Sequence, residues 1–277
     1  MKPSILLARD IIPGRALTSA RHTSRRPMRV IAAALRRLAT EARKYKESIE
    51  ELLGFTVYYD VVPAPAGRKV ALKSRSSCRI LMCAPGTNQY LVFESLFERD
   101  CAVVFWAMKS VRSVEAQYGP IEWTDEDGVI HEHWADLRVQ YDNGEVVLYC
   151  VRPAEKVKRG ALKAMVEDIC NHALKYHAHR IEILTEKVVT KSDIYRAREI
   201  LAARRLKNSP DCARLVELLK TKTKPVRAFE LLDEFGLGGA GWIALWNLMG
   251  DGLVEHVTSD KSLTFEPVSF VRARRAN

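Results

Sequence analysis

The pattern between residues 91 and 153 constrains the fold of this 277-residue chain more than any other feature. Residues 91–110 place apolar side chains at the three-to-four-residue spacing of a helix, and apolar residues then alternate with polar ones as far as residue 153. Alternation of that kind is typical of strands. The pairs Asp127-Gly128 and Asn143-Gly144 interrupt it and favour turns, and the second pair predicts a hairpin.

A second helix and a further strand follow this segment. Residues 161–176 carry helical periodicity, and Arg180–Leu184 is short enough for a strand. Another strand is predicted before them all, at Thr56–Val62. The order of helix, three or four strands, helix and strand indicates an α/β fold with a mixed sheet, which we expect over residues 54–186.

The C-terminal third is rich in helices. Four are predicted there, over Asp193–Arg205, Ser209–Lys220, Pro225–Phe235 and around Gly241–Met249. Two short strands separated by a Ser-Asp turn should follow the last helix. Three helices and such a wing are the outline of a winged helix-turn-helix. We therefore expect an α-rich winged-helix domain over residues 209–271, preceded by a connecting helix within residues 187–208.

The formal net charge of +10 is concentrated at the ends of the chain. Residues 1–50 carry 12 basic and 4 acidic side chains, whereas residues 51–271 carry 29 and 30. This describes a neutral body with a basic arm at 1–53, whose residues 28–53 predict an amphipathic helix, and a basic tail at 272–277. DNA, a polyanion, is the expected partner. The candidate DNA-binding residues are Arg25, Arg26, Arg29, Arg36 and Arg37 in the arm, and Arg68, Lys69, Lys73 and Arg75 in a basic loop.

Composition and cysteine spacing exclude several other classes of protein. Hydrophobic residues make up 47% and charged residues 28% of the chain, which is typical of a folded protein rather than a disordered one. The six cysteines include no C-x-x-C pair, so neither a disulfide scaffold nor a structural zinc site is expected. No apolar run approaches the roughly 18 residues of a membrane span, so no membrane partner is expected.

Three features of the α/β segment fit the chemistry of a metal-dependent nuclease. Such a site holds carboxylates on rigid elements, so that divalent cations lie between them and the scissile phosphate. One arrangement combines a Glu from a helix, an Asp near the start of a strand, and an E-x-K or Q-x-K pair on the next strand, where residues i and i+2 share a side. This chain offers Glu98 in the first helix, Asp136 at the start of ADLRVQY, and Leu148–Pro153 as the return strand.

Short segments in the same order resemble the TnsA family, the endonuclease partner of heteromeric cut-and-paste transposons. They are FESLFERD (93–100), Gln117 within VEAQYGPIEW, HWADLRV, NGEVVLYCVRP and HAHRIEILTEKVV. The resemblance covers residues 90–275 approximately. It implies a restriction-endonuclease-like domain followed by a winged-helix domain, with Mg²⁺ or Mn²⁺ bound by Glu98 and Asp136. It also implies a transposase and an AAA+ ATPase as partners, in the bacterial cytoplasm and at the nucleoid when DNA is bound.

Two site positions depart from the family's pattern. The family's Glu or Gln falls at Cys150 and its Lys at Arg152. A thiol is soft and mostly protonated near neutral pH, so it is a poor substitute for a hard oxygen ligand, and a guanidinium does not readily donate a proton. Alternatives stay open for the others: an ion pair on the helix face for Glu98, a strand cap for Asp136, and a small apolar core position for Cys150.

Two functions are therefore expected as alternatives. The first is a TnsA-like endonuclease that acts on transposon-end DNA through a divalent-metal site, with Glu98, Asp136, Cys150 and Arg152 as its catalytic positions. The second is a non-catalytic DNA-binding or assembly factor, or a regulator, built on an inactivated nuclease fold and needing no metal. Regulation is the weakest form, because the expected recognition helix offers mainly Asn247 for reading bases.

Overall fold

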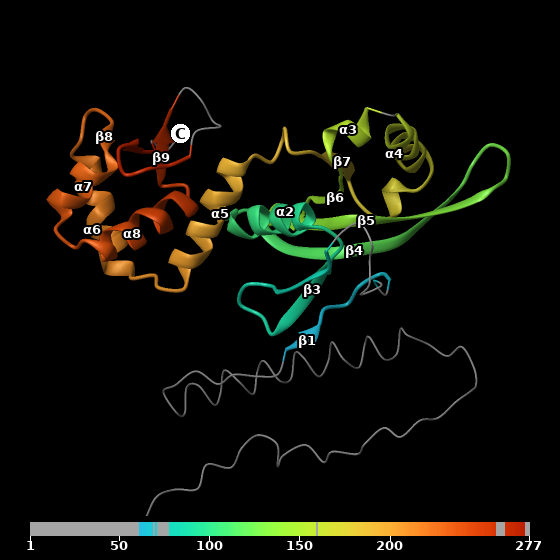
Figure 1. The fold of residues 1–277 in the computed structure, drawn as a ribbon, viewed down its shortest axis with the longest axis horizontal. Coiled ribbons are helices and arrows are strands. Elements are labelled where there is room, and N and C mark those ends of the chain that lie inside the picture. Colours follow the sequence, from blue (N-terminus) through green and yellow to red (C-terminus); the bar gives the residue numbers. More distant parts are fainter. Residues whose placement is uncertain (1–60, 69, 71–77, 159, 259–263, 275–277) are drawn as a thin grey trace, which may run out of the picture. The chain divides into compact units, whose positions relative to one another are not determined.

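The computed structural model describes residues 61–68, 70, 78–158, 160–258 and 264–274 (Figure 1). All of these residues belong to one compact unit, residues 59–277. The predicted helix at 28–53 and all but the end of the predicted strand Thr56–Val62 lie outside the described residues.

A small three-stranded sheet opens the described part of the chain. Its strands are β1 (Val62–Pro63), β2 (Ile80–Cys83) and β3 (Gln89–Phe93), in the order β1-β3-β2. The prediction of a helix from residue 91 was wrong at its start, because Leu91–Phe93 complete β3 and turn Leu91 and Phe93 into the core. The helix, α2, runs over Leu96–Ala107 and is capped by Ser95, whose side chain accepts a hydrogen bond from the Glu98 N–H.

The predicted mixed sheet follows α2. Its strands are β4 (Val111–Thr124), β5 (Ile130–Tyr141), β6 (Val146–Val151) and β7 (Arg180–Leu184), in the order β4-β5-β6-β7. The first three strands are antiparallel and β7 is parallel to β6. The predicted hairpin at Asn143-Gly144 is confirmed, and Gly144 supplies the positive φ of 87° in its turn.

Helices pack against both faces of this sheet. Successive residues of a strand point to opposite faces, so Tyr149 joins Leu137 and Phe105 of α2 in one apolar cluster, while Cys150 joins Ile169 in another. Ile169 belongs to α4 (Ala161–His172), which follows the short α3 (Ala154–Val157). The helix predicted over 161–176 is therefore divided, because a separate 3-10 turn forms its last part at Leu174–Tyr176.

The C-terminal helices occur in the predicted order. They are α5 (Lys191–Arg204), α6 (Ser209–Lys220), α7 (Ala228–Phe235) and α8 (Gly239–Gly250). An antiparallel sheet accompanies them, with strands β8 (Val226–Arg227), β10 (Phe270–Ala273) and β9 (Val254–Val257) in that order. The helix predicted from residue 225 begins later, because Val226 and Arg227 pair with β10. Arg272, predicted to begin a basic tail, lies in β10 and forms an ion pair with Glu255.

Helix α2 belongs to two apolar clusters at once. Its residues Val103 and Ala107 are buried together with α5, α6, α7 and α8, whereas Phe105 faces the large sheet. Arg204 of α5 adds hydrogen bonds from its guanidinium to the carbonyl oxygens of Trp106 and Ala107, at 2.9 and 2.8 Å. The helix predicted as a connection within 187–208 is thus part of the core. The division into domains at 54–186 and 209–271 stays a prediction.

Among the helices that the structure describes, none is long and apolar enough to cross a membrane.

Candidate functional site

The N-terminus of α2 holds Glu98 in a buried position. Only 4% of this residue is exposed, and its carboxylate folds back over the start of its own helix. One oxygen accepts the Glu94 N–H at 2.8 Å, and the other accepts the Ser95 hydroxyl at 2.9 Å. The carboxylate therefore stabilises the helix start through backbone and hydroxyl donors, instead of the ion pair along the helix face that the sequence left open.

Asp136 lies where strands β5 and β6 separate. The last register pair between them is Leu137 with Tyr149, and Asp136 is the next residue along β5. Its Oδ2 accepts the Val151 N–H at 2.7 Å and the Arg152 Nη1 at 2.6 Å. The carboxylate thus takes the place of a strand partner for β6. The prediction that Asp136 begins a strand was wrong, because β5 starts at Ile130.

Gln117 of β4 completes the group, and its side chain is buried, with 1% of the residue exposed. Its Nε2 donates to Glu98 Oε2 at 3.3 Å, and its Oε1 accepts both Nε and Nη2 of Arg68, at 2.9 and 2.7 Å. Gln117 also has a φ of 54°, which residues other than glycine seldom adopt. Backbone strain of this kind persists only where the surrounding contacts maintain it, and such residues cluster at functional sites.

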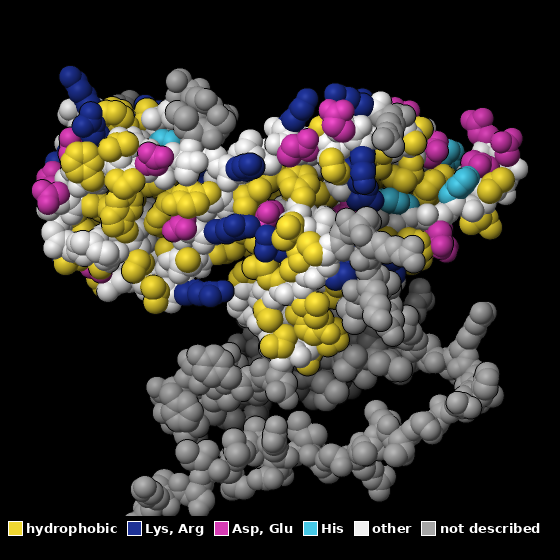
Figure 2. All heavy atoms as spheres, in the orientation of Figure 1, with side chains coloured by type: hydrophobic (Ala, Val, Ile, Leu, Met, Phe, Trp, Pro, Cys, Tyr) yellow, Lys and Arg dark blue, Asp and Glu magenta, His cyan; other side chains and the backbone are white. Residues whose placement is uncertain are grey.

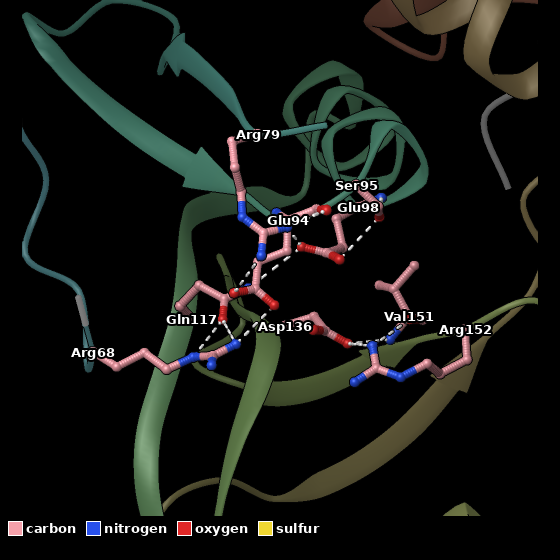
Figure 3. Close-up of polar contacts among 9 residues, drawn as sticks. All are labelled: Arg68, Arg79, Glu94, Ser95, Glu98, Gln117, Asp136, Val151 and Arg152. Atoms are coloured by element: carbon pink, nitrogen blue, oxygen red, sulfur yellow. Dashed lines mark hydrogen bonds and ion pairs between the residues drawn. The ribbon is translucent and has the colours of Figure 1, made fainter. Parts of the chain in front are cut away.

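Figure 3 shows these side chains pointing toward one another from four elements: Glu98 from α2, Gln117 from β4, Asp136 from β5 and Arg152 from the end of β6. The predicted residues Glu98, Asp136 and Arg152 therefore lie together. In the sequence, Gln117 stood out only as part of a segment that resembles the TnsA family. Strand alternation places Gln117 and the buried Ala116 on opposite faces of β4, so no local pattern marked Gln117 as a site residue.

Burial and neighbouring charges shift the protonation of both buried carboxyl groups. Burial and, after it, the nearby charge of Asp136 raise the pKa of Glu98 to about 7. Burial also raises the pKa of Asp136, while the Arg152 charge lowers it. The site therefore holds a proton on Glu98 over much of the pH range below neutrality, and Arg152 supplies the positive charge that pairs with Asp136.

Cys150 has a different environment from these three residues. It is fully buried in the apolar cluster with Leu148 and Ile169, so the core position anticipated for it is confirmed. Its Sγ lies 3.5 Å from His133 Nε2. Burial raises the pKa of the Cys150 thiol to about 12, which keeps it protonated and unsuited to bind a metal ion at neutral pH.

A Mg²⁺ or Mn²⁺ ion does not fit this group of side chains as they are arranged. Mg²⁺ requires several oxygen ligands in near-octahedral geometry, yet Asp136 Oδ2 already binds the guanidinium of Arg152, and both oxygens of Glu98 accept hydrogen bonds. Among the described residues, no group of three or more His, Cys, Asp and Glu side chains is placed to hold a metal. The guanidinium of Arg152 therefore occupies the position beside Asp136 that a bound metal ion would take.

Of the predicted DNA-binding residues, the structure describes Arg68 alone. Its guanidinium binds Gln117 and forms an ion pair with Glu94 at 2.9 Å, so this arginine supports the buried site. The others lie outside the described residues and stay predictions: Arg25, Arg26, Arg29, Arg36, Arg37, Lys69, Lys73 and Arg75. Asn247, the polar residue of the expected recognition helix, is buried and donates to the carbonyl oxygens of Ala203 and Ile243.

The chain matches no model of a known protein family, and comparison with curated proteins finds no match either. The likeness to the TnsA family therefore rests on the short segments of the sequence.

Proposed function

We propose that this protein is a DNA-binding factor built on a restriction-endonuclease-like fold, which holds DNA without cutting it. The observation that carries the proposal is the ion pair between Arg152 and Asp136. In a metal-dependent nuclease the aspartate binds a divalent cation. Here the arginine at the expected lysine position neutralises that aspartate from within the chain, and the neighbouring Cys150 offers no oxygen ligand.

The fold supports the first half of this proposal. Helix, antiparallel strands, helix and parallel strand occur in the order expected of a nuclease-type domain, and Glu98 and Asp136 converge as that arrangement requires. The C-terminal helices α6, α7 and α8, followed by a small antiparallel sheet, agree with a winged-helix domain. The excess of basic residues in the arm supplies the attraction to DNA. A transposase and an AAA+ ATPase in the bacterial cytoplasm are the partners that the family likeness suggests.

The second candidate is an active TnsA-like endonuclease that nicks transposon-end DNA. It is favoured by the convergence of the buried Glu98 and Asp136, since proteins bind Mg²⁺ through one or two carboxylates together with substrate phosphates. The two candidates differ in whether metal reaches Asp136.

A nicking assay on supercoiled plasmid distinguishes them. Wild-type protein with Mg²⁺ or Mn²⁺ should retard the plasmid on a gel and leave it supercoiled, and a chelator should not change the retardation. Nicking by the wild type that Asp136→Asn abolishes would show that the site is catalytic. A wild type that neither retards nor nicks the plasmid would exclude both candidates.

Binding of Mn²⁺, followed by electron paramagnetic resonance, tests the role given to Arg152. Arg152→Ala removes a positive charge from Asp136 and should bind Mn²⁺ about tenfold more tightly than the wild type, since one charge at a few ångströms is worth a kcal/mol or more. Arg138→Ala is the matched control, because Arg138, in β5, also forms an ion pair with an acidic residue, Glu115. Equal affinities in all three proteins would contradict the proposal.

A further inference from the structure

A pocket of about 390 Å³ opens between α5, α8 and the segment before β10. Figure 2 shows hydrophobic side chains gathered over α5 and α8, with acidic side chains beside them. The pocket contains none of the residues assigned to the nuclease-type site. Its volume falls in the range of cavities that hold small ligands.

Aromatic rings form the walls of this pocket. Trp246 lies nearly perpendicular to both Tyr195 and Phe265, with ring centroids 6.1 and 5.0 Å away. Trp242 stands at 70° to Phe265, with a centroid separation of 6.2 Å. Because neighbouring rings are nearly perpendicular, the pocket lining includes both ring faces and ring edges. The negatively polarised face of an aromatic ring attracts cations, with tryptophan the strongest of them.

Two carboxylates share the same pocket. Glu199 and Glu266 are both among its lining residues, and both charges, after burial, raise the pKa of Tyr195. Neither carboxylate has an ion pair or a side-chain hydrogen bond within the described part of the chain. Among the described residues that line the pocket there is no lysine, arginine or histidine. The pocket therefore combines aromatic rings with two negative charges, and no described residue is paired with either charge.

We propose that this pocket binds an arginine side chain from a basic segment of a partner protein. The planar guanidinium stacks on aromatic faces and binds carboxylates through several donors, and its apolar stem suits the alanine, leucine and isoleucine side chains in the lining. The same charges disfavour a nucleic acid here, because phosphates and carboxylates repel each other. This face of the C-terminal region is thus a protein-binding surface, independent of how the rest of the molecule contacts DNA.

The test is calorimetric titration of the full chain with a peptide of alternating glycine and arginine, acetylated and amidated at its ends. The comparison peptide has citrulline, which keeps the shape of arginine without its charge. The arginine peptide should bind, with quenching of tryptophan fluorescence, and the citrulline peptide should bind at least about tenfold more weakly. Equal affinity for the two peptides would overturn the proposal.

Variants locate the binding on the protein. The double change Glu199→Gln and Glu266→Gln should weaken the arginine peptide about tenfold, whereas the control Glu230→Gln and Asp233→Asn, which removes two exposed acids from α7, should leave its affinity unchanged. Trp242→Leu keeps an apolar side chain and removes the ring face, so it should also weaken binding. Equal losses in the two double variants would indicate general charge attraction and contradict the proposal. DNA retardation by the Glu199 and Glu266 variant should equal that of the wild type.

Discussion

Glu98 is a carboxyl group that folding makes less acidic, with consequences for stability. Its folded-state pKa of about 7 lies above the ordinary value of 4.5, so the native state binds the proton more tightly than the unfolded chain. Stability from this source is fully present below pH 4.5 and is lost as the pH rises to about 7. Asp136 shifts in the same direction.

Glu98→Gln should remove this pH dependence and keep an acceptor at the helix start. Between pH 4.5 and 8 we expect wild type to lose up to about 3 kcal/mol of unfolding free energy relative to the variant, from 1.36 kcal/mol per pKa unit. Urea unfolding at several pH values measures it. Glu155→Gln, at a side chain that is 78% exposed, should leave the wild-type profile intact. Parallel profiles for wild type and Glu98→Gln would contradict the prediction.

The residues of the site were predictable from sequence only in part. Glu98 and Asp136 were singled out because a helix glutamate and a strand aspartate fit the carboxylate pattern of a metal-dependent nuclease. Arg152 was singled out only because it falls where the family that the chain resembles has a lysine. Gln117 was not, because its burial depends on a positive φ and on the donors of Arg68, neither of which any local pattern encodes. The ion pair of Arg152 with Asp136 likewise depends on where two strands part.

At the scale of elements, the close packing of α8 on α5 rests on a glycine. A Cβ at Gly250 would lie 2.5 Å from Cγ2 of Ile200, which is a stiff β-branched side chain in a helix. At Gly239, the first residue of α8, a Cβ would meet nothing within 4 Å. The two ends of one helix therefore differ in whether they tolerate a methyl group.

Gly250→Ala should destabilise the protein by about 1–3 kcal/mol through overpacking. Gly239→Ala should be neutral or stabilise it by up to about 1 kcal/mol, because alanine loses less conformational entropy on folding. Thermal and urea unfolding of both variants would check the pair. A Gly250→Ala variant as stable as Gly239→Ala would show that α8 is not held this tightly against α5.

Element order was easier to predict than element ends, for physical reasons. Strand alternation and helix periodicity extend over many residues, so β4 to β7 and α5 to α8 appeared in the expected sequence. Ends depend on single contacts. Helix α5 begins before the predicted Asp193, because Thr190 and Asp193 form a capping box at its N-terminus. Helix α7 begins after the predicted residue 225, because Val226 pairs with strand β10.

At the scale of the whole molecule, the uneven distribution of charge along the chain should determine its affinity for DNA and the salt dependence of that affinity. The excess of basic residues lies in residues 1–50, while residues 51–271 are nearly neutral. Each phosphate contact released by a substitution should flatten the dependence of log affinity on log salt by roughly 0.9.

Replacing Arg25, Arg26 and Arg29 by glutamine should therefore weaken DNA binding and reduce that slope by up to about 3. Fluorescence anisotropy over a range of salt concentrations measures both. The control changes Lys163, Lys175 and Lys187, which are exposed in the described structure, to glutamine and alters the net charge equally. If both triple variants lose the same slope, the arm has no special role.

The double membership of α2 bears on how such a chain could have evolved. Protein domains are exchanged between genes most readily at junctions where separation exposes no hydrophobic core. A cut between β7 and α6 would leave Val103 and Ala107 of α2 facing water, and the C-terminal helices would lose those partners. The two halves are therefore expected to be inherited together, and a transplant of the C-terminal helices onto another protein would have to carry a helix from the opposite half of the gene.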